Sequence, residues 1–236
     1  MNKIPSIKEL RKICQASGPD FESQTYCGRL NRVFSIYLTR IFISLPFSPN
    51  QITILSMVFF TIGVFLYVFN LFWLNLLGLG LIIFCHILDG VDGELSRYQK
   101  KNNGLGGQYV EPIGHDFQYA IMFLPIAVGL SHIKDFPLIL ILASTATIGK
   151  LLFRLLQLRF FLLNPEKRKK TFSSQKFSPT IFHKTYYNLF TSTGLIAPLL
   201  LATLLNKLQY FIIFYGISFP LIFLILFIRQ LIKIKI

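Results

Sequence analysis

The sequence predicts an all-helical membrane protein: a bundle of six transmembrane helices preceded by an amphipathic helix that lies along the membrane surface. Three observations lead to this fold class. Of the 236 residues, 53% are hydrophobic and only 14% are charged, a balance typical of membrane proteins and not of soluble domains. Six apolar runs are long enough to cross a bilayer, which takes about 20 helical residues. The positive charges gather in alternate connections between these runs.

The six runs are separated by short turns or polar loops, so successive spans are expected to run in opposite directions. The predicted spans cover residues 51–70, 72–97, 107–131, 137–163, 186–206 and 208–230. We expect a single domain over residues 1–236, with an N-terminal segment at 1–48 and the helical bundle at 49–236.

Lysine and arginine mark one side of the bundle. Of the 24 cationic residues, 19 fall in four segments, at residues 1–40, 97–101, 167–184 and 229–235. The positive-inside rule therefore places both termini in the cytosol, with the protein in the cytoplasmic membrane. The net charge of +14 lies mainly on this face, which suits anionic lipid headgroups and phosphorylated substrates. Nucleic-acid binding is the competing interpretation of so basic a chain, but no polar module is present to carry it.

The residues before the first span predict a helix at the membrane surface. Residues 31–45 are apolar but are interrupted by Arg32 and Arg40, so the stretch is too short and too charged to span and suits the cytosolic interface. Ser48 and Pro49 then mark the turn into the first span, since proline favours the first turn of a helix.

Two features are not expected. The first 20 residues lack the charged and apolar regions of a signal peptide, so we expect none to be removed. The three cysteines, Cys14, Cys27 and Cys85, have no paired spacing, so we expect neither a disulfide framework nor a zinc site.

Acidic residues lie inside the apolar region. Asp89 and Asp92 share one face of a predicted helix, and Glu111 and His115 lie one turn apart on the next helix. If the polar break at residues 98–106 is a turn, the two helices are antiparallel and all four side chains meet near the cytosolic surface. Such a group would repel itself and cost several kcal/mol of desolvation unless a cation neutralises it. A lone acid there would be an ordinary interfacial residue, whereas this cluster predicts an oxygen-rich cation site.

The surroundings of the cluster point to phosphate chemistry. Gly93 and Gly107 leave room for a ligand to approach the backbone. Arg97 offers a forked cation that matches a phosphate. Carboxylates for a hard divalent metal together with an arginine for phosphate are typical of phosphoryl transfer.

These residues form a pattern that resembles the signature of the CDP-alcohol phosphatidyltransferase family, which reads D-x2-D-G-x2-A-R, eight or nine residues, G-x3-D-x3-D. The matching positions here are Asp89, Asp92, Gly93, Ser96, Arg97, Gly107, Glu111 and His115. The six spans, the surface helix and the Ser-Pro-Asn-x-Ile-Thr run at Ser48 also resemble that family, so the resemblance covers about residues 31–229. Three positions depart from the pattern: Ser96 replaces alanine, and Glu111 and His115 replace the third and fourth aspartates.

The resemblance implies a function and a set of partners. Members of the family move a phosphoalcohol group from a CDP-linked donor to an acceptor hydroxyl and release CMP, using two divalent metal ions. The implied partners are the bilayer, a donor that is CDP-diacylglycerol in most members or a soluble CDP-alcohol in some, and an alcohol or phosphorylated-alcohol acceptor. A homodimer is implied by the resemblance alone.

The resemblance also implies roles for individual residues. The implied ligands of Mg²⁺ or Mn²⁺ are Asp89, Asp92, Glu111 and His115. The implied contacts of the CDP group are Gly93, Arg97 and Gly107. Glu111 keeps a carboxylate that is one methylene longer, whereas a histidine ligand favours Mn²⁺ over Mg²⁺, which prefers oxygen.

The catalytic base is the open question of the site. The family's fourth aspartate takes the proton of the attacking hydroxyl, and the imidazole of His115 can do the same at neutral pH. On a regular helix His115 lies about 40° around the axis from Glu111, whereas Asp116 lies about 140° away. A distortion of the helix near Gly114 would exchange the two. Asp116 otherwise orients a histidine, either His115 or His86.

Two cations lie within the fourth predicted span. Lys150 and Arg154 are one helical turn apart, and Lys150 lies roughly 20 Å into the bilayer from the outer side. Because cations inside a membrane are functional candidates, we expect both to bind a phosphate or pyrophosphate, such as that of a phosphorylated acceptor. The alternative is that they only neutralise the acids. For the whole protein, the alternative to an enzyme is a non-catalytic or transport protein that binds divalent cations or lipid on the same fold.

Overall fold

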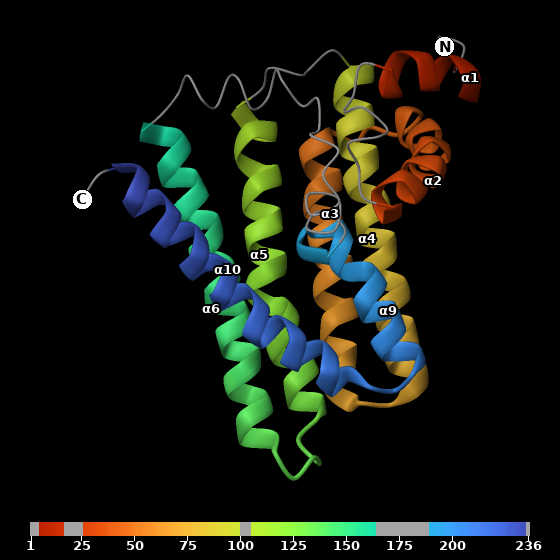
Figure 1. Ribbon diagram of the computed structural model, residues 1–236. Helices are drawn as coiled ribbons and strands as arrows, with labels where there is room; N and C mark the ends of the chain where they lie inside the picture. Colours follow the sequence, from red (N-terminus) through yellow and green to blue (C-terminus); the bar gives the residue numbers. More distant parts are fainter. Residues whose placement is uncertain (1–4, 17–25, 100–104, 164–188, 235–236) are drawn as a thin grey trace. The chain divides into compact units, whose positions relative to one another are not determined.

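The computed structural model describes residues 5–16, 26–99, 105–163 and 189–234, and every regular element in these ranges is helical (Figure 1). In chain order the elements are α1 (Ile7–Leu10), η1 (Arg11–Gln15), α2 (Tyr26–Ile43), α3 (Pro49–Leu66), η3 (Tyr67–Phe69), α4 (Phe72–Tyr98), α5 (Leu105–Gly129), α6 (Phe136–Leu163), η4 (Thr193–Leu195), α9 (Ile196–Leu204) and α10 (Leu208–Ile234). The predicted all-α class is confirmed for the described residues.

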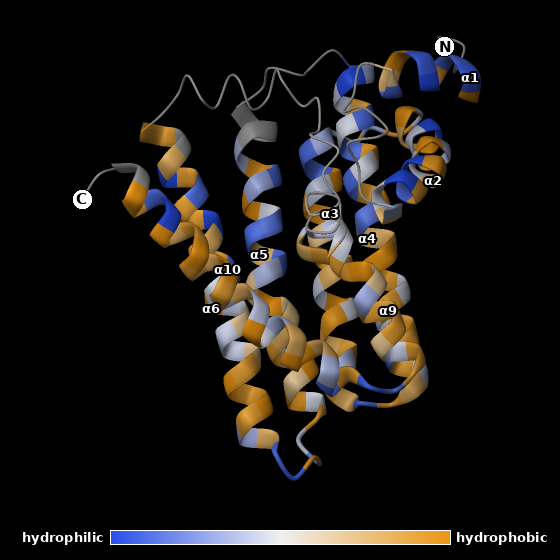
Figure 2. Ribbon diagram, viewed as in Figure 1, coloured by the Kyte–Doolittle hydropathy of each residue, from blue (hydrophilic) through white to orange (hydrophobic). Residues whose placement is uncertain are grey.

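Among the described residues, four helices are long and apolar enough to cross a membrane. They cover Pro49–Phe69, Phe72–Tyr98, Phe136–Phe160 and Leu208–Ile232, and as candidate spans they coincide with four of the six predicted ones. Figure 2 shows hydrophobic residues along most of α6 and α10.

The other two predicted spans are not confirmed. The helix α5 covers the predicted span at 107–131 but is not among the four, and it carries Glu111, His115 and Asp116. The described part of the predicted span at 186–206 holds only a short apolar helix at Thr193–Leu204, and residues 186–188 lie outside the described ranges.

The start of α3 shows how the local sequence fixes a helix end. The Gln51 backbone N–H donates to Ser48 Oγ at 3.3 Å, and the Ser48 N–H donates to Gln51 Oε1 at 2.8 Å. The Gln51 N–H also lies 3.1 Å from the Ser48 carbonyl oxygen, so the reciprocal pair closes the first turn of the helix and gives the Ser48 N–H an acceptor. Pro49 is the first residue of the helix, as predicted. The turn therefore sets where Thr53, one turn later, lies on α3.

The predicted surface helix at residues 31–45 is present as α2, which begins five residues earlier, at Tyr26. Its small polar residues face inward, since Asn31, Ser35 and Thr39 are buried. Large apolar residues such as Leu30, Phe34, Tyr37 and Ile41 are exposed on it. An exposed apolar stripe suits a lipid surface, and the place of α2 at the membrane interface stays a prediction.

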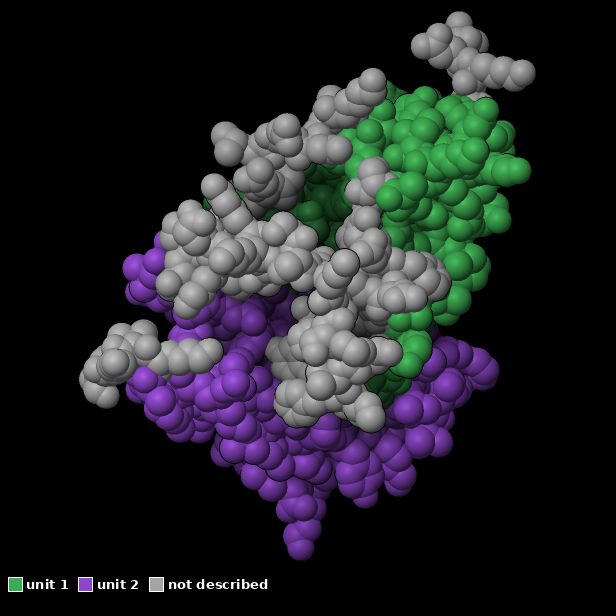
Figure 3. Space-filling view, turned by 45° about the horizontal axis from the view of Figure 1, so that its top comes forward, with its two compact units in different colours: residues 1–63, 79–115, 178–198 green, residues 64–78, 116–177, 199–236 purple. Residues whose placement is uncertain are grey.

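The chain divides into two compact units, coloured green and purple in Figure 3. The first unit comprises residues 1–63, 79–115 and 178–198, and the second comprises residues 64–78, 116–177 and 199–236. The first unit has two clusters of fully buried apolar residues: one around Ile52, Leu88, Val91 and Leu95, and one around Leu10, Cys14 and Ile36. These clusters hold α3, α4, α2 and the N-terminal helices together.

The second unit is built on the packing of α6 against α10. A Cβ added at Gly149 would lie 2.7 Å from the Pro220 backbone nitrogen, and one at Gly216 would lie 2.7 Å from the Leu142 carbonyl oxygen. Only glycine permits so close an approach at these two points. Beside them, the rings of Phe123, Phe211, Tyr215 and Phe219 pack against one another.

Candidate active site

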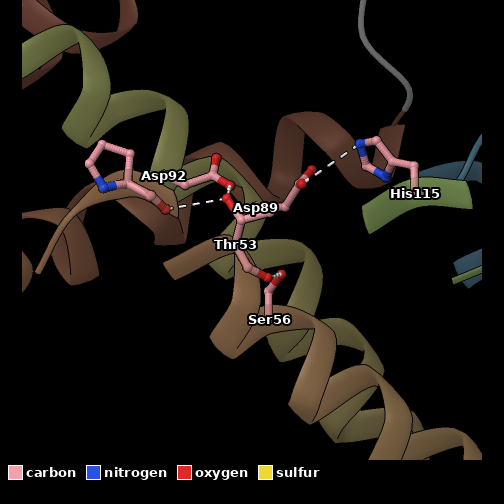
Figure 4. Close-up of polar contacts among 6 residues, drawn as sticks. Thr53, Ser56, Asp89, Asp92 and His115 are labelled. Carbon is pink, nitrogen blue, oxygen red and sulfur yellow. Dashed lines mark hydrogen bonds and ion pairs between the residues drawn. The ribbon is translucent and has the colours of Figure 1, made fainter. Parts of the chain in front are cut away.

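The two aspartates of the candidate site come from α4, in the first unit. Asp92 is only 6% exposed, and its Oδ2 accepts a hydrogen bond of 2.5 Å from Thr53 Oγ1 (Figure 4). Thr53 Oγ1 also lies 3.2 Å from the Pro49 carbonyl oxygen, so the hydroxyl is positioned by the first turn of α3. The sequence placed Thr53 in the Ser-Pro-Asn-x-Ile-Thr run, but nothing in the pattern indicated that its hydroxyl would bond Asp92.

His115 lies beside the other aspartate. Its Nε2 is 3.7 Å from Asp89 Oδ1, and both side chains are about one-fifth exposed (Figure 4). His115 Nδ1 is buried without a hydrogen-bond partner in the described part of the chain. The helices α4 and α5 thus bring the predicted pair together, with one imidazole nitrogen towards a carboxylate.

The helix α5 is continuous from Leu105 to Gly129, so the distortion near Gly114 that would exchange His115 and Asp116 is not present. Glu111 is exposed on this helix, one turn before His115. The Glu111 carboxylate is close enough to Asp89 and Asp92 for the three negative charges to repel one another.

Asp116 pairs with a different partner. Its Oδ1 accepts from Arg154 Nε in an ion pair within the second unit. Asp116 is therefore paired with an arginine and not with His115 or His86. His86, the other histidine considered, is 3% exposed and packs edge-on against the Phe60 ring, with centroids 6.3 Å apart. His86 therefore packs against α3, and a role in orienting the site stays a prediction.

The donor atoms of the site suit a divalent cation, because carboxylate oxygens are the ligands that Mg²⁺ and Mn²⁺ accept in proteins. Within the described ranges, however, no group of three or more histidine, cysteine, aspartate or glutamate side chains lies close enough to enclose one ion. The chemistry of Asp89, Asp92 and Glu111 fits a metal, while their side chains do not form a closed coordination shell.

Arg97 lies on the last turn of α4, and its guanidinium lies over Gly93, which is predicted to contact the CDP group. A Cβ added at Gly93 would lie 3.3 Å from one terminal nitrogen of the Arg97 guanidinium, so the absent side chain makes room for this group. Arg97 Nε donates to the Cys14 carbonyl oxygen. Gly107, the third residue expected near the CDP group, lies in the first turn of α5.

Lys150 and Arg154 lie on α6 in the second unit. Lys150 is 4% exposed, and its Nζ lies over three rings, at 4.5 Å from Tyr119, 5.2 Å from Phe153 and 4.9 Å from Phe219. Such contacts stabilise a cation in apolar surroundings. The cation of Lys150 is thus surrounded by aromatic rings, and that of Arg154 is paired with Asp116; their predicted role in binding the acceptor stays a prediction.

Comparison with known proteins identifies the family of the chain. A search of curated proteins found no match. The family model described as CDP-alcohol phosphatidyltransferase matches residues 47–230, well over half of the chain. This range contains every residue of the pattern from Asp89 to His115. The chain therefore belongs to the CDP-alcohol phosphatidyltransferase family.

Proposed function

We propose that this protein transfers a phosphoalcohol group, such as a phosphatidyl group, from a CDP-linked donor to an alcohol hydroxyl and releases CMP. Membership of the family supports phosphatidyl transfer in phospholipid synthesis. The observation that carries the proposal is the contact between α4 and α5, where His115 faces Asp89 beside a buried Asp92 that is fixed by Thr53.

In this proposal Asp89, Asp92 and Glu111 hold Mg²⁺ or Mn²⁺, with His115 as a further ligand or as the base. A divalent ion held by these residues would supply positive charge to offset that of the donor diphosphate and of the leaving CMP. The hydrogen bond from Thr53 fixes the Asp92 carboxylate, which also accepts from the Gly93 backbone N–H. A carboxylate held in one orientation supports a metal role for Asp92.

The proton of the acceptor passes to His115. As the imidazole accepts this proton, the acceptor oxygen forms a bond to the phosphorus of the alcohol phosphate. The bond between that phosphorus and the CMP oxygen breaks, and CMP leaves with the electron pair. Asp89 then stabilises the protonated imidazole. The distance of 3.7 Å between Asp89 Oδ1 and His115 Nε2 supports this role. Because Asp116 is paired with Arg154, His115 is the stronger candidate for the base.

The anionic groups of both substrates would lie against positively charged residues of the protein. Gly93, Arg97 and Gly107 would contact the CDP group, with CDP-diacylglycerol as the first donor to test and a soluble CDP-alcohol as the second. Lys150 and Arg154 would bind a phosphorylated acceptor, unless they serve only to balance Asp116. We place both termini and the site on the cytosolic side of the cytoplasmic membrane and expect a homodimer.

The test is CMP release by the purified protein in detergent, with Mg²⁺ or Mn²⁺, CDP-diacylglycerol and a pooled set of alcohols. We expect release that requires both metal and acceptor and that is abolished in Asp89→Asn. Cation transport across vesicles without any CDP-linked substrate would instead indicate a transport protein. No release with either class of donor would contradict the transferase.

A further inference from the structure

The helices at the N-terminus pack onto the same helix that carries the acidic residues, although they lie outside the range that matches the family. We refer to residues 7–15, which form α1 and η1, as the 7–15 segment. Its residues Leu10 and Cys14 are fully buried with Ile36 of α2, and Tyr98 at the end of α4 packs against this cluster. All of these residues belong to the first unit.

Glu94 is the centre of the polar contacts in this region. It is fully buried on α4, two residues after Asp92, and it was not singled out in the sequence. Its Oε1 accepts from Gln15 Nε2 at 2.7 Å and from Ser35 Oγ at 2.7 Å, and its Oε2 accepts from Thr39 Oγ1 at 2.6 Å. A buried carboxylate is costly unless it is hydrogen-bonded, so these three donors are what allow Glu94 to lie there.

In the 7–15 segment, Gln15 and Cys14 make the hydrogen bonds that reach α2 and α4. Gln15 Nε2 also donates to the Arg32 carbonyl at 2.8 Å, and the Gln15 carbonyl accepts from an Arg32 terminal nitrogen at 3.0 Å. The neighbouring residue, Cys14, accepts from Arg97 Nε through its carbonyl. Two consecutive residues of the 7–15 segment therefore hold Glu94 and Arg97, which are one turn apart on α4.

The helix α2 completes the arrangement. Ser35 packs against Gly90, where an added Cβ would lie only 3.0 Å from the Ser35 Cβ. Gly90 and Glu94 are one turn apart, so they form a face of α4 separate from that of Asp89 and Asp92. One face of α4 carries the acids, and another fixes the helix and its arginine to the N-terminal region.

We propose that the 7–15 segment is a positioning element for the donor site: Gln15 and Cys14 hold Glu94 and Arg97, and thereby orient the Arg97 guanidinium towards an anionic diphosphate. With Nε bonded to Cys14, the terminal nitrogens remain over Gly93, where the guanidinium is fixed before the ligand arrives. Fixing a guanidinium in advance reduces the entropy lost on binding a phosphate. This inference rests on the proposed function, because it takes the ligand to be a CDP group.

The first test measures the contact itself, without any reaction. In a Cys27→Ser, Cys85→Ala background, Cys14 is the only thiol, and its rate of labelling reports whether the 7–15 segment stays packed. Glu94→Ala should raise this rate at least tenfold, because it removes the acceptor of the buried Ser35 and Thr39 hydroxyls and of the partly buried Gln15 amide. Glu94→Gln should stay within threefold of the parent, since its amide oxygen can still accept from Gln15 and Ser35, while the Thr39 hydroxyl can accept from the amide nitrogen.

The second test measures the dissociation constant of CDP in the presence of saturating Mn²⁺. We expect Glu94→Ala to weaken CDP binding at least tenfold, and Gln15→Ala to weaken it in the same direction. Glu94→Gln should restore binding to within threefold. Lys12→Ala, an exposed change in the same segment, is the matched control and should alter neither CDP binding nor Cys14 labelling. Gln15→Ala keeps the test decisive if Glu94→Ala does not fold.

The outcomes separate the inference from the proposed function. If Cys14 stays protected in Glu94→Ala, the contact does not hold the segment and the inference is wrong. If Cys14 becomes reactive but CDP binds with unchanged affinity, the segment does not position the donor site, and the transferase proposal stands. If the parent protein does not bind CDP at all, both are overturned.

Discussion

At the scale of single residues, the hydroxyl of Thr53 is the first feature whose role can be measured. It donates a hydrogen bond to the buried carboxylate of Asp92, which would lose this donor if the hydroxyl were removed. A hydrogen bond to a charged group contributes about 1.5–3 kcal/mol, so Thr53→Val should lower CMP release about 10- to 100-fold. Thr53→Ser should retain most of the activity.

The control for this change is Thr61→Val on the same helix. The Thr61 hydroxyl donates only to the Met57 carbonyl of its own helix, at 2.8 Å, so its loss should leave CMP release nearly unchanged. Equal losses in Thr53→Val and Thr61→Val would mean that the threonines act through helix stability and not through Asp92.

The choice of base is also decided at single residues. His115 faces Asp89, whereas Asp116 is paired with Arg154. Loss of a general base typically lowers a rate by about 10²- to 10⁴-fold, so His115→Ala should lose at least 100-fold in CMP release. Asp116→Asn should lose less than about tenfold, because it removes an ion pair and not the proton acceptor. The reverse order of losses would move the base to Asp116.

The Cys14 thiol offers a pH measurement outside the membrane-spanning helices. Burial, reinforced by the charge of Glu94, raises the pKa of Cys14 to about 11. Only the thiolate reacts, so labelling of the folded protein should rise about tenfold per pH unit towards pH 11. The unfolded protein should reach its plateau near the ordinary thiol pKa, about 8.5. A plateau at that same pH in the folded protein would show that Cys14 is not buried.

At the scale of helices, the crossing of α6 and α10 depends on two glycines. Gly149→Ala and Gly216→Ala would each place a Cβ within 2.7 Å of backbone atoms of the facing helix. Overpacking of this kind costs about 1–3 kcal/mol, so both variants should unfold at lower temperature or lower denaturant concentration. Gly80→Ala in α4 is the control, since an added Cβ there meets nothing within 4 Å. An unchanged stability in Gly149→Ala would contradict the close crossing.

Helix positions were largely predictable from the sequence, whereas long-range polar contacts were not. The start of α3 at Pro49 follows from its own turn, which needs only neighbouring residues. Glu94 could not be singled out, because its partner Gln15 lies 79 residues away and carries no motif. The burial of Ser35 and Thr39 could not be predicted for the same reason: the sequence showed the apolar residues of α2, but not that these two hydroxyls would bond Glu94.

At the scale of the whole molecule, the pattern from Asp89 to His115 was enough to predict the family, because its spacing spans two helices. The pairing of His115 with Asp89 follows from helical periodicity once the break between the helices is taken as a turn. The pairing of Asp116 with Arg154 did not follow, since it depends on where α6 lies beside α5. The six spans and the cytosolic orientation rest on composition and charge, and they stay predictions.

The acidic cluster makes a prediction for the stability of the whole protein. Asp89, Asp92 and Glu111 repel one another without a cation, so a bound divalent ion should stabilise the folded protein. An ion at 100 times its dissociation constant adds about 2.7 kcal/mol, which should appear as a clear rise in Tm with Mn²⁺ and a fall with a chelator. Asp92→Asn should remove most of this response, while Asp135→Asn, an acid in the turn before α6, should keep it. If the rise in Tm is the same in Asp92→Asn, the ion binds elsewhere and the acids of α4 are not its ligands.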